Sequence, residues 1–192
     1  MVSIINCVSE GVGLIITLFV TGFPAAWMIS SNGTEATVDY FIAALKKNNP
    51  GVILKIIMSD FDWCQINSAR RHYPAALVLL CWWHVLHAWQ QHLHINEHPE
   101  LWKLLKGWIR LTEISEFNEC WVKIQSLAPA NFIEYIQNTW WKHWKMWSAM
   151  TRTDCTVYQL SDTNMLVKVY VFCPCGARNL YLVLSSPDGT IC

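Results

Sequence analysis

Charged side chains are scarce in this sequence, and neither sign is in excess. Asp, Glu, Lys and Arg make up only 15% of the residues, below the usual quarter, and 14 basic residues face 14 acidic ones. The chain therefore lacks the overall positive field that a strong, autonomous DNA-binding protein usually carries. Disorder is also disfavoured, because hydrophobic residues reach 53%.

A hydrophobic run long enough to cross a membrane is missing as well. The apolar stretch at residues 12–20 spans about nine residues, whereas a membrane helix needs roughly 20. No Lys or Arg occurs in residues 1–11, which disfavours a secretory signal peptide. The eight Cys are scattered rather than arranged as a disulfide framework, so we interpret them as mainly reduced thiols. We expect no membrane partner.

What the sequence does contain in excess is tryptophan, with 12 residues in a chain of 192. Such a chain is long enough to bury roughly 70% of its unfolded surface. A substantial core rich in aromatic side chains is therefore expected.

The N-terminal third alternates between strand and helix character. Two apolar runs, residues 14–20 and 25–29, predict adjacent strands joined by a short turn. Thr34 then has the residue type of a helix N-cap, and apolar residues recur after it with helical spacing. The turn-forming residues 48–51 predict the end of this amphipathic helix.

A strand, helix, strand unit follows. Residues 52–58 and 75–80 are continuous apolar runs of strand length, and the segment between them has a short helical pattern. Parallel strands joined by a helix imply an α/β sheet. Asp60 and Cys81 directly follow the two strands, at the edge where open α/β sheets place their ligands.

The remaining chain changes character twice. Residues 81–150 are Trp-rich and helical, with two apolar stripes that each need a partner helix: Leu101, Leu104, Leu105, Trp108 and Ile109, then Phe117, Cys120, Trp121 and Ile124. Beyond residue 154 the periodicity is lost, and residues 167–172 and 180–184 have strand character.

Asp60 is the first candidate functional residue. A carboxylate at the end of a buried strand is costly to desolvate unless it binds a cation or accepts hydrogen bonds, which suggests a metal ligand. The alternative is that Asp60 or Asp62 only caps the following helix, an ordinary role for Asp.

Cys81 and His84 are the second candidate, because their i, i+3 spacing puts both on one helix face, where they suit Zn²⁺. A structural zinc site needs four ligands, so the alternative is a buried thiol among hydrogen-bonded histidines, of which His87, His92, His94 and His98 lie nearby. The pair Cys173 and Cys175 is a weaker signal still.

The clustered Trp residues allow two interpretations. Trp82, Trp83 and Trp89, and later Trp140, Trp141, Trp144 and Trp147, suit stacking on unpaired bases, with Lys142, Lys145 and Arg152 as phosphate contacts. The alternative, which we favour, is that these stripes form core, since Trp140, Trp144 and Trp147 fit one helical face.

Taken in order, these motifs resemble those of Mutator-like element (MULE) transposases over residues 22–168. Residues 22–27 look like the family's G-x-P-x-x-W turn, and Thr34 with Glu35 opens its helix. Asp60 matches the second catalytic Asp. The C-x-x-H signature matches Cys81 and His84, and residues 162–168 resemble the T-N-N-x-x-E segment that ends in the last catalytic Glu.

The resemblance implies a ribonuclease-H-like (integrase-like) mixed sheet with a Trp-rich, all-helical insertion. In the family, an Asp, Asp, Glu triad holds two divalent cations, normally Mg²⁺, for in-line phosphoryl transfer on DNA. Here Lys168 stands at the position of the Glu, and an ammonium repels metal ions. The first Asp should lie on a strand before Leu14, and the segment from Met1 is too short to supply it.

The sequence therefore predicts a fragment of a MULE-type transposase, with DNA as partner and nuclear, otherwise cytoplasmic, location implied by the family. Residues 1–84 are expected to form an incomplete core, residues 85–153 a helical insertion, and residues 154–192 a core remnant with a divergent tail. We expect it to be catalytically inactive, the alternative being a DNA- or protein-binding module. A missing first strand would also expose a sheet edge for self-association.

Overall fold

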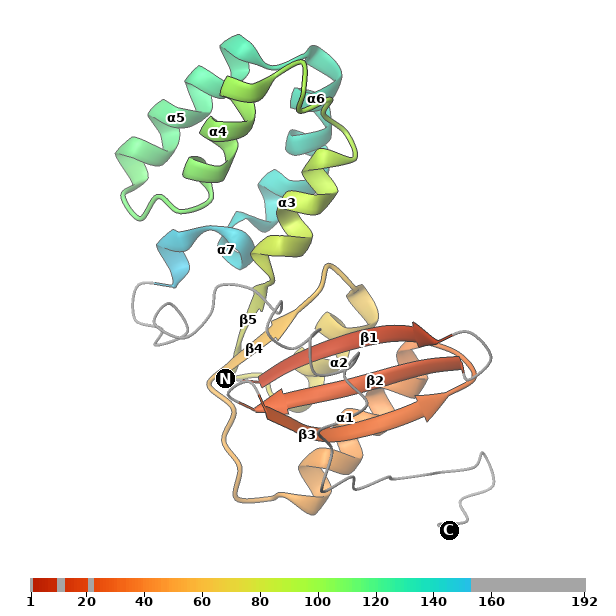
Figure 1. The fold of residues 1–192 in the computed structure, drawn as a ribbon. Helices are drawn as coiled ribbons and strands as arrows, with labels where there is room; N and C mark the ends of the chain where they lie inside the picture. Colours follow the sequence, from red (N-terminus) through yellow and green to blue (C-terminus); the bar gives the residue numbers. More distant parts are fainter. Residues whose placement is uncertain (1, 10–12, 21–22, 153–192) are drawn as a thin grey trace. The chain divides into compact units, whose positions relative to one another are not determined.

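The computed structural model describes residues 2–9, 13–20 and 23–152, which form a mixed α/β protein (Figure 1). These residues fall into two compact units, one ending at Leu79 and one beginning at Leu80. We call them the sheet unit and the helical unit. In the described range, the helical unit ends at Arg152.

The sheet unit begins with an antiparallel meander. Strand β1 (Val2–Ser9) pairs with β2 (Gly13–Val20), which pairs in turn with β3 (Phe23–Ser30). A register shift between Leu18 and Phe19 marks an irregularity in the second pairing. The predicted strands at residues 14–20 and 25–29 are confirmed as β2 and as part of β3.

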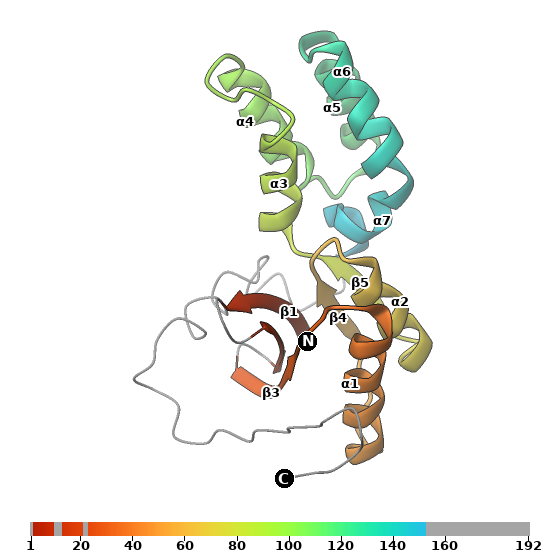
Figure 2. The same ribbon diagram turned by 90° about the vertical axis from the view of Figure 1, so that its right-hand side faces the viewer.

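Two further strands extend the sheet on the other side of β1. Helix α1 (Glu35–Asn48) leads to β4 (Ile56–Ser59), and helix α2 (Trp63–His72) leads to β5 (Leu77–Leu80). β4 runs parallel to β1, and the strand order is β3-β2-β1-β4-β5. Figure 2 shows α1 and α2 together on one face of this sheet.

β1 corrects the prediction that the first strand is missing. Only three residues separate two eight-residue antiparallel strands along the chain, so the short segment after Met1 does supply the strand before Leu14. β1 lies inside the sheet, between β2 and β4, and the edge strands are β3 and β5. The expected open edge at the β1 position, on which self-association was predicted, is therefore filled.

The predicted strand at residues 52–58 is wrong in its first half. Val52 and Ile53 are 50% and 84% exposed, and β4 begins only at Ile56. A strand persists where a neighbouring backbone pairs with it, and β1 reaches β4 at only two positions, Ile57 and Met58. The predicted helix between the strands is confirmed as α2.

Helix α1 is predicted correctly at both ends. Thr34 is the N-cap, and its hydroxyl accepts a hydrogen bond from the Thr37 N–H at 3.4 Å. The helix ends at Asn48, and its buried residues are Val38, Phe41 and Ile42. A capping residue followed by a regular apolar stripe thus specified this element locally.

The helical unit consists of helices throughout its described residues. These are α3 (Trp82–Gln90), α4 (Pro99–Trp108), α5 (Ile114–Leu127), α6 (Ala130–Tyr135) and α7 (Trp144–Trp147), with a π-helix at Ile136–Trp140 and short 3-10 turns at Trp141–His143 and Ala149–Thr151. Both predicted apolar stripes are largely confirmed, on α4 and α5, where all their members except Leu104 are buried.

Tryptophan rings form the centre of this unit. Trp108 is fully buried, and its ring lies 5.8 Å from Trp89, 5.0 Å from Trp147 and 4.8 Å from Phe117. Trp140 is buried as well. The interpretation of the Trp stripes as core is confirmed for these residues.

Along the described chain, every helix is too short or too polar to cross a bilayer. The predicted strands at residues 167–172 and 180–184, together with Cys173 and Cys175, lie outside the described residues.

Candidate functional site

Asp60 follows β4 directly and is half-buried at the end of the strand. Its backbone carbonyl accepts hydrogen bonds from the Ser59 hydroxyl at 2.8 Å and from the Asp62 N–H at 2.7 Å. Ser59 is completely buried, and its hydroxyl also lies 2.6 Å from the amide oxygen of buried Gln65 on α2. The strand end is thus held in a tight turn that leads into α2.

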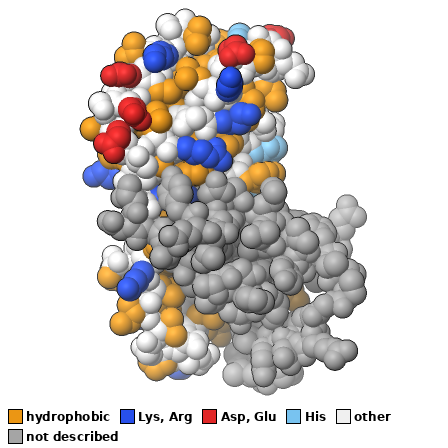
Figure 3. Space-filling view, turned by 60° about the vertical axis from the view of Figure 1, so that its left-hand side comes forward, with side chains coloured by type: hydrophobic (Ala, Val, Ile, Leu, Met, Phe, Trp, Pro, Cys, Tyr) orange, Lys and Arg blue, Asp and Glu red, His pale blue; other side chains and the backbone are white. Residues whose placement is uncertain are grey.

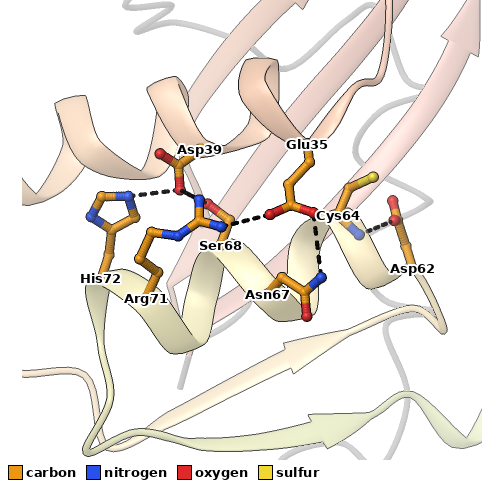
Figure 4. A network of polar contacts seen from close by, with 8 residues as sticks. All are labelled: Glu35, Asp39, Asp62, Cys64, Asn67, Ser68, Arg71 and His72. Atoms are coloured by element: carbon orange, nitrogen blue, oxygen red, sulfur yellow. Dashed lines mark hydrogen bonds and ion pairs between the residues drawn. The ribbon is translucent and has the colours of Figure 1, made fainter.

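Asp62, not Asp60, is the residue that caps α2. Its carboxylate accepts a hydrogen bond from the Cys64 N–H at 2.8 Å (Figure 4). Burial and the adjacent Asp62 charge together raise the pKa of the Cys64 thiol. The capping alternative is therefore correct for Asp62, which leaves Asp60 without that role.

The described residues do not supply the donors of a two-metal site around Asp60. β1 pairs Ser3 with Met58, and continuing this register by two residues places Ile5 opposite Asp60. β1 contains no Asp or Glu, and within the described ranges no three His, Cys, Asp or Glu residues gather as metal ligands. The predicted third position, Lys168, lies outside the described residues together with Asp162 and Asn164.

Cys81 and His84 lie at the start of α3. Cys81 is the N-cap residue and is completely buried, and His84 is half-buried, with its ring edge-on to Trp83 at 4.8 Å. His87 lies on the exposed side, stacked on Trp83, and His92 stacks on Tyr135 at 3.7 Å. These histidines therefore pack against aromatic rings, and a zinc site at Cys81 and His84 stays a prediction.

An ion-pair network between α1 and α2 was not predicted from the sequence. Arg71 of α2 donates to Glu35 and to Asp39 of α1, each at 2.6 Å, and the His72 ring lies 2.9 Å from Asp39 (Figure 4). The spacing of Glu35 and Asp39, one helical turn apart, was the available signal. The sequence did not show that α2 packs against these two carboxylates of α1, so the ion pairs could not be predicted.

This network lowers the pKa of both carboxyl groups. Hydrogen bonds from Arg71 and then from Asn67 lower the pKa of Glu35. For Asp39, the hydrogen bond from Ser68 at 2.9 Å lowers the pKa most, followed by those from Arg71 and His72. Both carboxylates are ion-paired across the contact between α1 and α2.

Arg152 corrects one of the predicted phosphate contacts. Its side chain is 1% exposed, donates to the Leu80 carbonyl and lies 4.5 Å over the Trp82 ring. A guanidinium buried in this way cannot reach a phosphate from solvent. Lys142 and Lys145 are exposed, as that prediction requires.

The Trp clusters divide by exposure. Trp82 and Trp89 are buried, whereas Trp83 is 36% exposed. Trp144 is half-buried rather than fully on the face shared by Trp140 and Trp147. The π-helix and the 3-10 turn before Trp144 change the helical register, so regular helical spacing does not hold there.

No known protein family matches this chain, and no curated protein matches its sequence. The case for function therefore depends on the arrangement of the residues themselves.

Proposed function

We propose that the chain derives from the catalytic domain of a MULE-type transposase and has lost metal-dependent DNA cleavage and strand transfer. The motifs in residues 22–168 suggest the family. The main support is the position of Asp60, the match to the second catalytic Asp. It directly follows β4, and β4 pairs with the central strand β1.

The sheet topology supports this proposal. A ribonuclease-H-like core requires an antiparallel three-stranded meander whose first strand then pairs in parallel with a strand reached through a helix. The order β3-β2-β1-β4-β5, with β1 antiparallel to β2 and parallel to β4, meets that requirement. The helical unit follows β5, where the family resemblance places its insertion.

The proposed loss of catalysis rests on the metal-ligating carboxylates that the chain lacks at the expected positions. A site for two divalent cations needs several carboxylates to neutralise concentrated positive charge. Extending the Ser3–Met58 register by two residues gives Ile5 as the β1 residue opposite Asp60, and Lys168 occupies the position expected for the Glu. In a chain of this descent, DNA is the ancestral partner and the nucleus the ancestral location.

Metal titration tests the proposal. Mn²⁺ binding is followed by water-proton relaxation. In the natural chain we expect no saturable binding that depends on Asp60, so Asp60→Asn should leave the titration unchanged. The double variant Ile5→Asp/Lys168→Glu should gain such binding, and adding Asp60→Asn should abolish it again.

The matched control is Asn6→Asp/Lys168→Glu, which adds the same charge one register position along β1 and should gain much less. Tight Asp60-dependent binding in the natural chain would contradict the loss of catalysis. Equal gains in the two double variants would contradict the assignment of the ancestral site.

A further inference from the structure

A row of basic side chains lies on the solvent face of α4. Lys103 and Lys106 are exposed on one side of the helix, and exposed Arg110 follows just beyond its end at Trp108, where its guanidinium donates to the Lys106 carbonyl at 2.9 Å. The opposite side of α4 carries buried Leu101 and Leu105. The row extends over about 10 Å at 1.5 Å per residue.

The acidic residues of the helical unit lie mostly elsewhere. Glu113, Glu116 and Glu119 belong to the start of α5 and the residue before it, and Glu100 bounds the basic row at its N-terminal end. Figure 3 shows several Lys and Arg side chains gathered on one face of this unit, with a His at the edge of the same face and Asp or Glu toward its margins. A nearly neutral unit thus has a locally positive face.

An exposed aromatic pair lies on the neighbouring helix α3. The Trp83 indole and the His87 imidazole stack with centroids 4.9 Å apart and planes inclined by only 9°. Trp83 is 36% exposed and His87 is exposed, unlike the buried Trp82 and Trp89 of the same helix. The pair is thus partly exposed, with His84 edge-on to the Trp83 ring at 4.8 Å.

Arg110, at the end of the basic row, lies close to the first residue of α3. Its guanidinium lies 5.0 Å over the ring of Trp82, the residue before Trp83. The end of the row therefore reaches the start of α3. Lys106, in the middle of the row, lies 5.8 Å over the ring of Trp102, so cationic and aromatic groups alternate along α4 as well.

We propose that this face, defined by Lys103, Lys106, Arg110, Trp83 and His87, binds single-stranded nucleic acid. Lysine and arginine contact the phosphates, and an unpaired base stacks on the Trp83 and His87 rings. A duplex keeps its base faces covered, so the aromatic pair would contribute nothing to duplex binding. The inference rests on the nucleic-acid partner in the proposed function and is independent of the metal site at Asp60.

The test measures binding of the full chain to a fluorescein-labelled single-stranded DNA of mixed sequence and to its duplex, by anisotropy over a range of salt concentrations. Lys103→Gln/Lys106→Gln should lower the slope of log affinity against log salt by about 1.4, since each phosphate contact contributes about 0.7 on a single strand. Its charge-matched control is Lys47→Gln/Lys55→Gln in the sheet unit, where both lysines are exposed.

Trp83→Ala should weaken single-strand binding roughly tenfold and leave duplex binding unchanged. Trp63→Ala, whose indole is 38% exposed in the sheet unit, is the matched control. His87→Ala removes the stacked partner from an exposed position and provides a second test if Trp83→Ala fails to fold.

Three results would overturn the inference: no single-strand binding at low salt, equal losses in the two lysine pairs, or a loss in Trp63→Ala that Trp83→Ala and His87→Ala do not share. A loss confined to Trp63→Ala would place single-strand binding in the sheet unit, and the proposed function would still stand. The opposite outcome is also distinguishable. If Ile5→Asp/Lys168→Glu gains no Asp60-dependent Mn²⁺ binding while Trp83→Ala still weakens single-strand binding, the proposed function fails and this inference stands.

Discussion

Both units of this chain have a buried apolar core, but they differ in the contacts that supplement it. In the helical unit, buried aromatic rings meet at Trp108, and the described cationic groups lie over rings or point to solvent. In the sheet unit, α1 and α2 are fastened at their surface by Arg71 between Glu35 and Asp39. Apolar burial is insensitive to salt and acid, whereas exposed ion pairs respond to both.

This difference also separates the two functional questions. The sheet unit carries Asp60, on which the proposed descent from a metal-dependent enzyme rests, and β1 beside its strand contains no Asp or Glu. The helical unit carries none of the expected catalytic residues among those described, yet it presents a cationic and aromatic face. Activity and binding therefore need to be tested separately.

The largest effect is expected at the centre of the aromatic core. Trp108→Ala removes a fully buried ring that contacts Trp89, Phe117 and Trp147 and donates to the Phe117 carbonyl at 3.1 Å. We expect a loss of about 3–5 kcal/mol of unfolding free energy. Urea unfolding followed by tryptophan fluorescence measures it well, because ten of the twelve Trp belong to this unit.

Trp83→Ala is the natural comparison for that variant, since it removes the same side chain from a partly exposed position. Its unfolding free energy should change far less. If both substitutions cost the same, the distinction between core and surface tryptophan is wrong.

Arg152 is expected to give the next largest effect. Arg152→Met keeps the apolar length of the side chain but removes the donor to the buried Leu80 carbonyl and the guanidinium over Trp82. The expected loss is about 2 kcal/mol, measured by the same unfolding experiment. The salt dependence of DNA binding should be unchanged, whereas a smaller slope would restore Arg152 as a phosphate contact.

A smaller loss is expected at the start of α1 in the sheet unit. Thr34→Ala removes the hydroxyl that accepts from the Thr37 N–H, at a cost of about 1 kcal/mol. Amide hydrogen exchange of α1 and α2 measures it, and Thr34→Ser, which keeps the hydroxyl, serves as the control. An equal effect in both variants would show that the methyl group and not the cap matters.

Acid should weaken the contact between α1 and α2 by the smallest amount. Because the folded pKa values of Glu35 and Asp39 are lowered, their contribution to stability is present above the ordinary values of 4.5 and 3.8. It is lost as the pH falls through the lowered folded values. Exchange rates of α1 amides should rise over that range and, at higher pH, also with salt. Asp39→Asn should respond less to both, and an unchanged response would contradict the role of the ion pairs.

Local signals in the sequence were sufficient for some elements and not for others. Thr34 with its apolar stripe specified α1, because capping and periodicity act within the helix itself. The start of β4 was not predictable in this way, since it depends on where β1 offers a backbone partner. The half-buried position of Trp144 was not predictable from regular spacing, because a π-helix and a 3-10 turn precede it.

The candidate site shows the same limit. Asp60 was found because a carboxylate after a buried strand is unusual, but the assignment of the cap to Asp62 required the hydrogen bond to Cys64. The burial of Arg152 depends on a carbonyl 72 positions away in the chain. No pattern within one segment contains that information.

The place of β1 in the sheet also has a consequence for the order of folding events. β1 and β2 are separated by only three residues along the chain, so this antiparallel pair can form within microseconds. On its other side β1 pairs with β4, where Ser3 lies opposite Met58. The long loop between these two residues can close only after α1 is positioned. We therefore expect the seam between β1 and β4 to form last and to set the folding rate of the sheet unit. Folding should then be slowed by substitutions at Met58, and also by Thr34→Ala, because α1 must be in place before the seam closes.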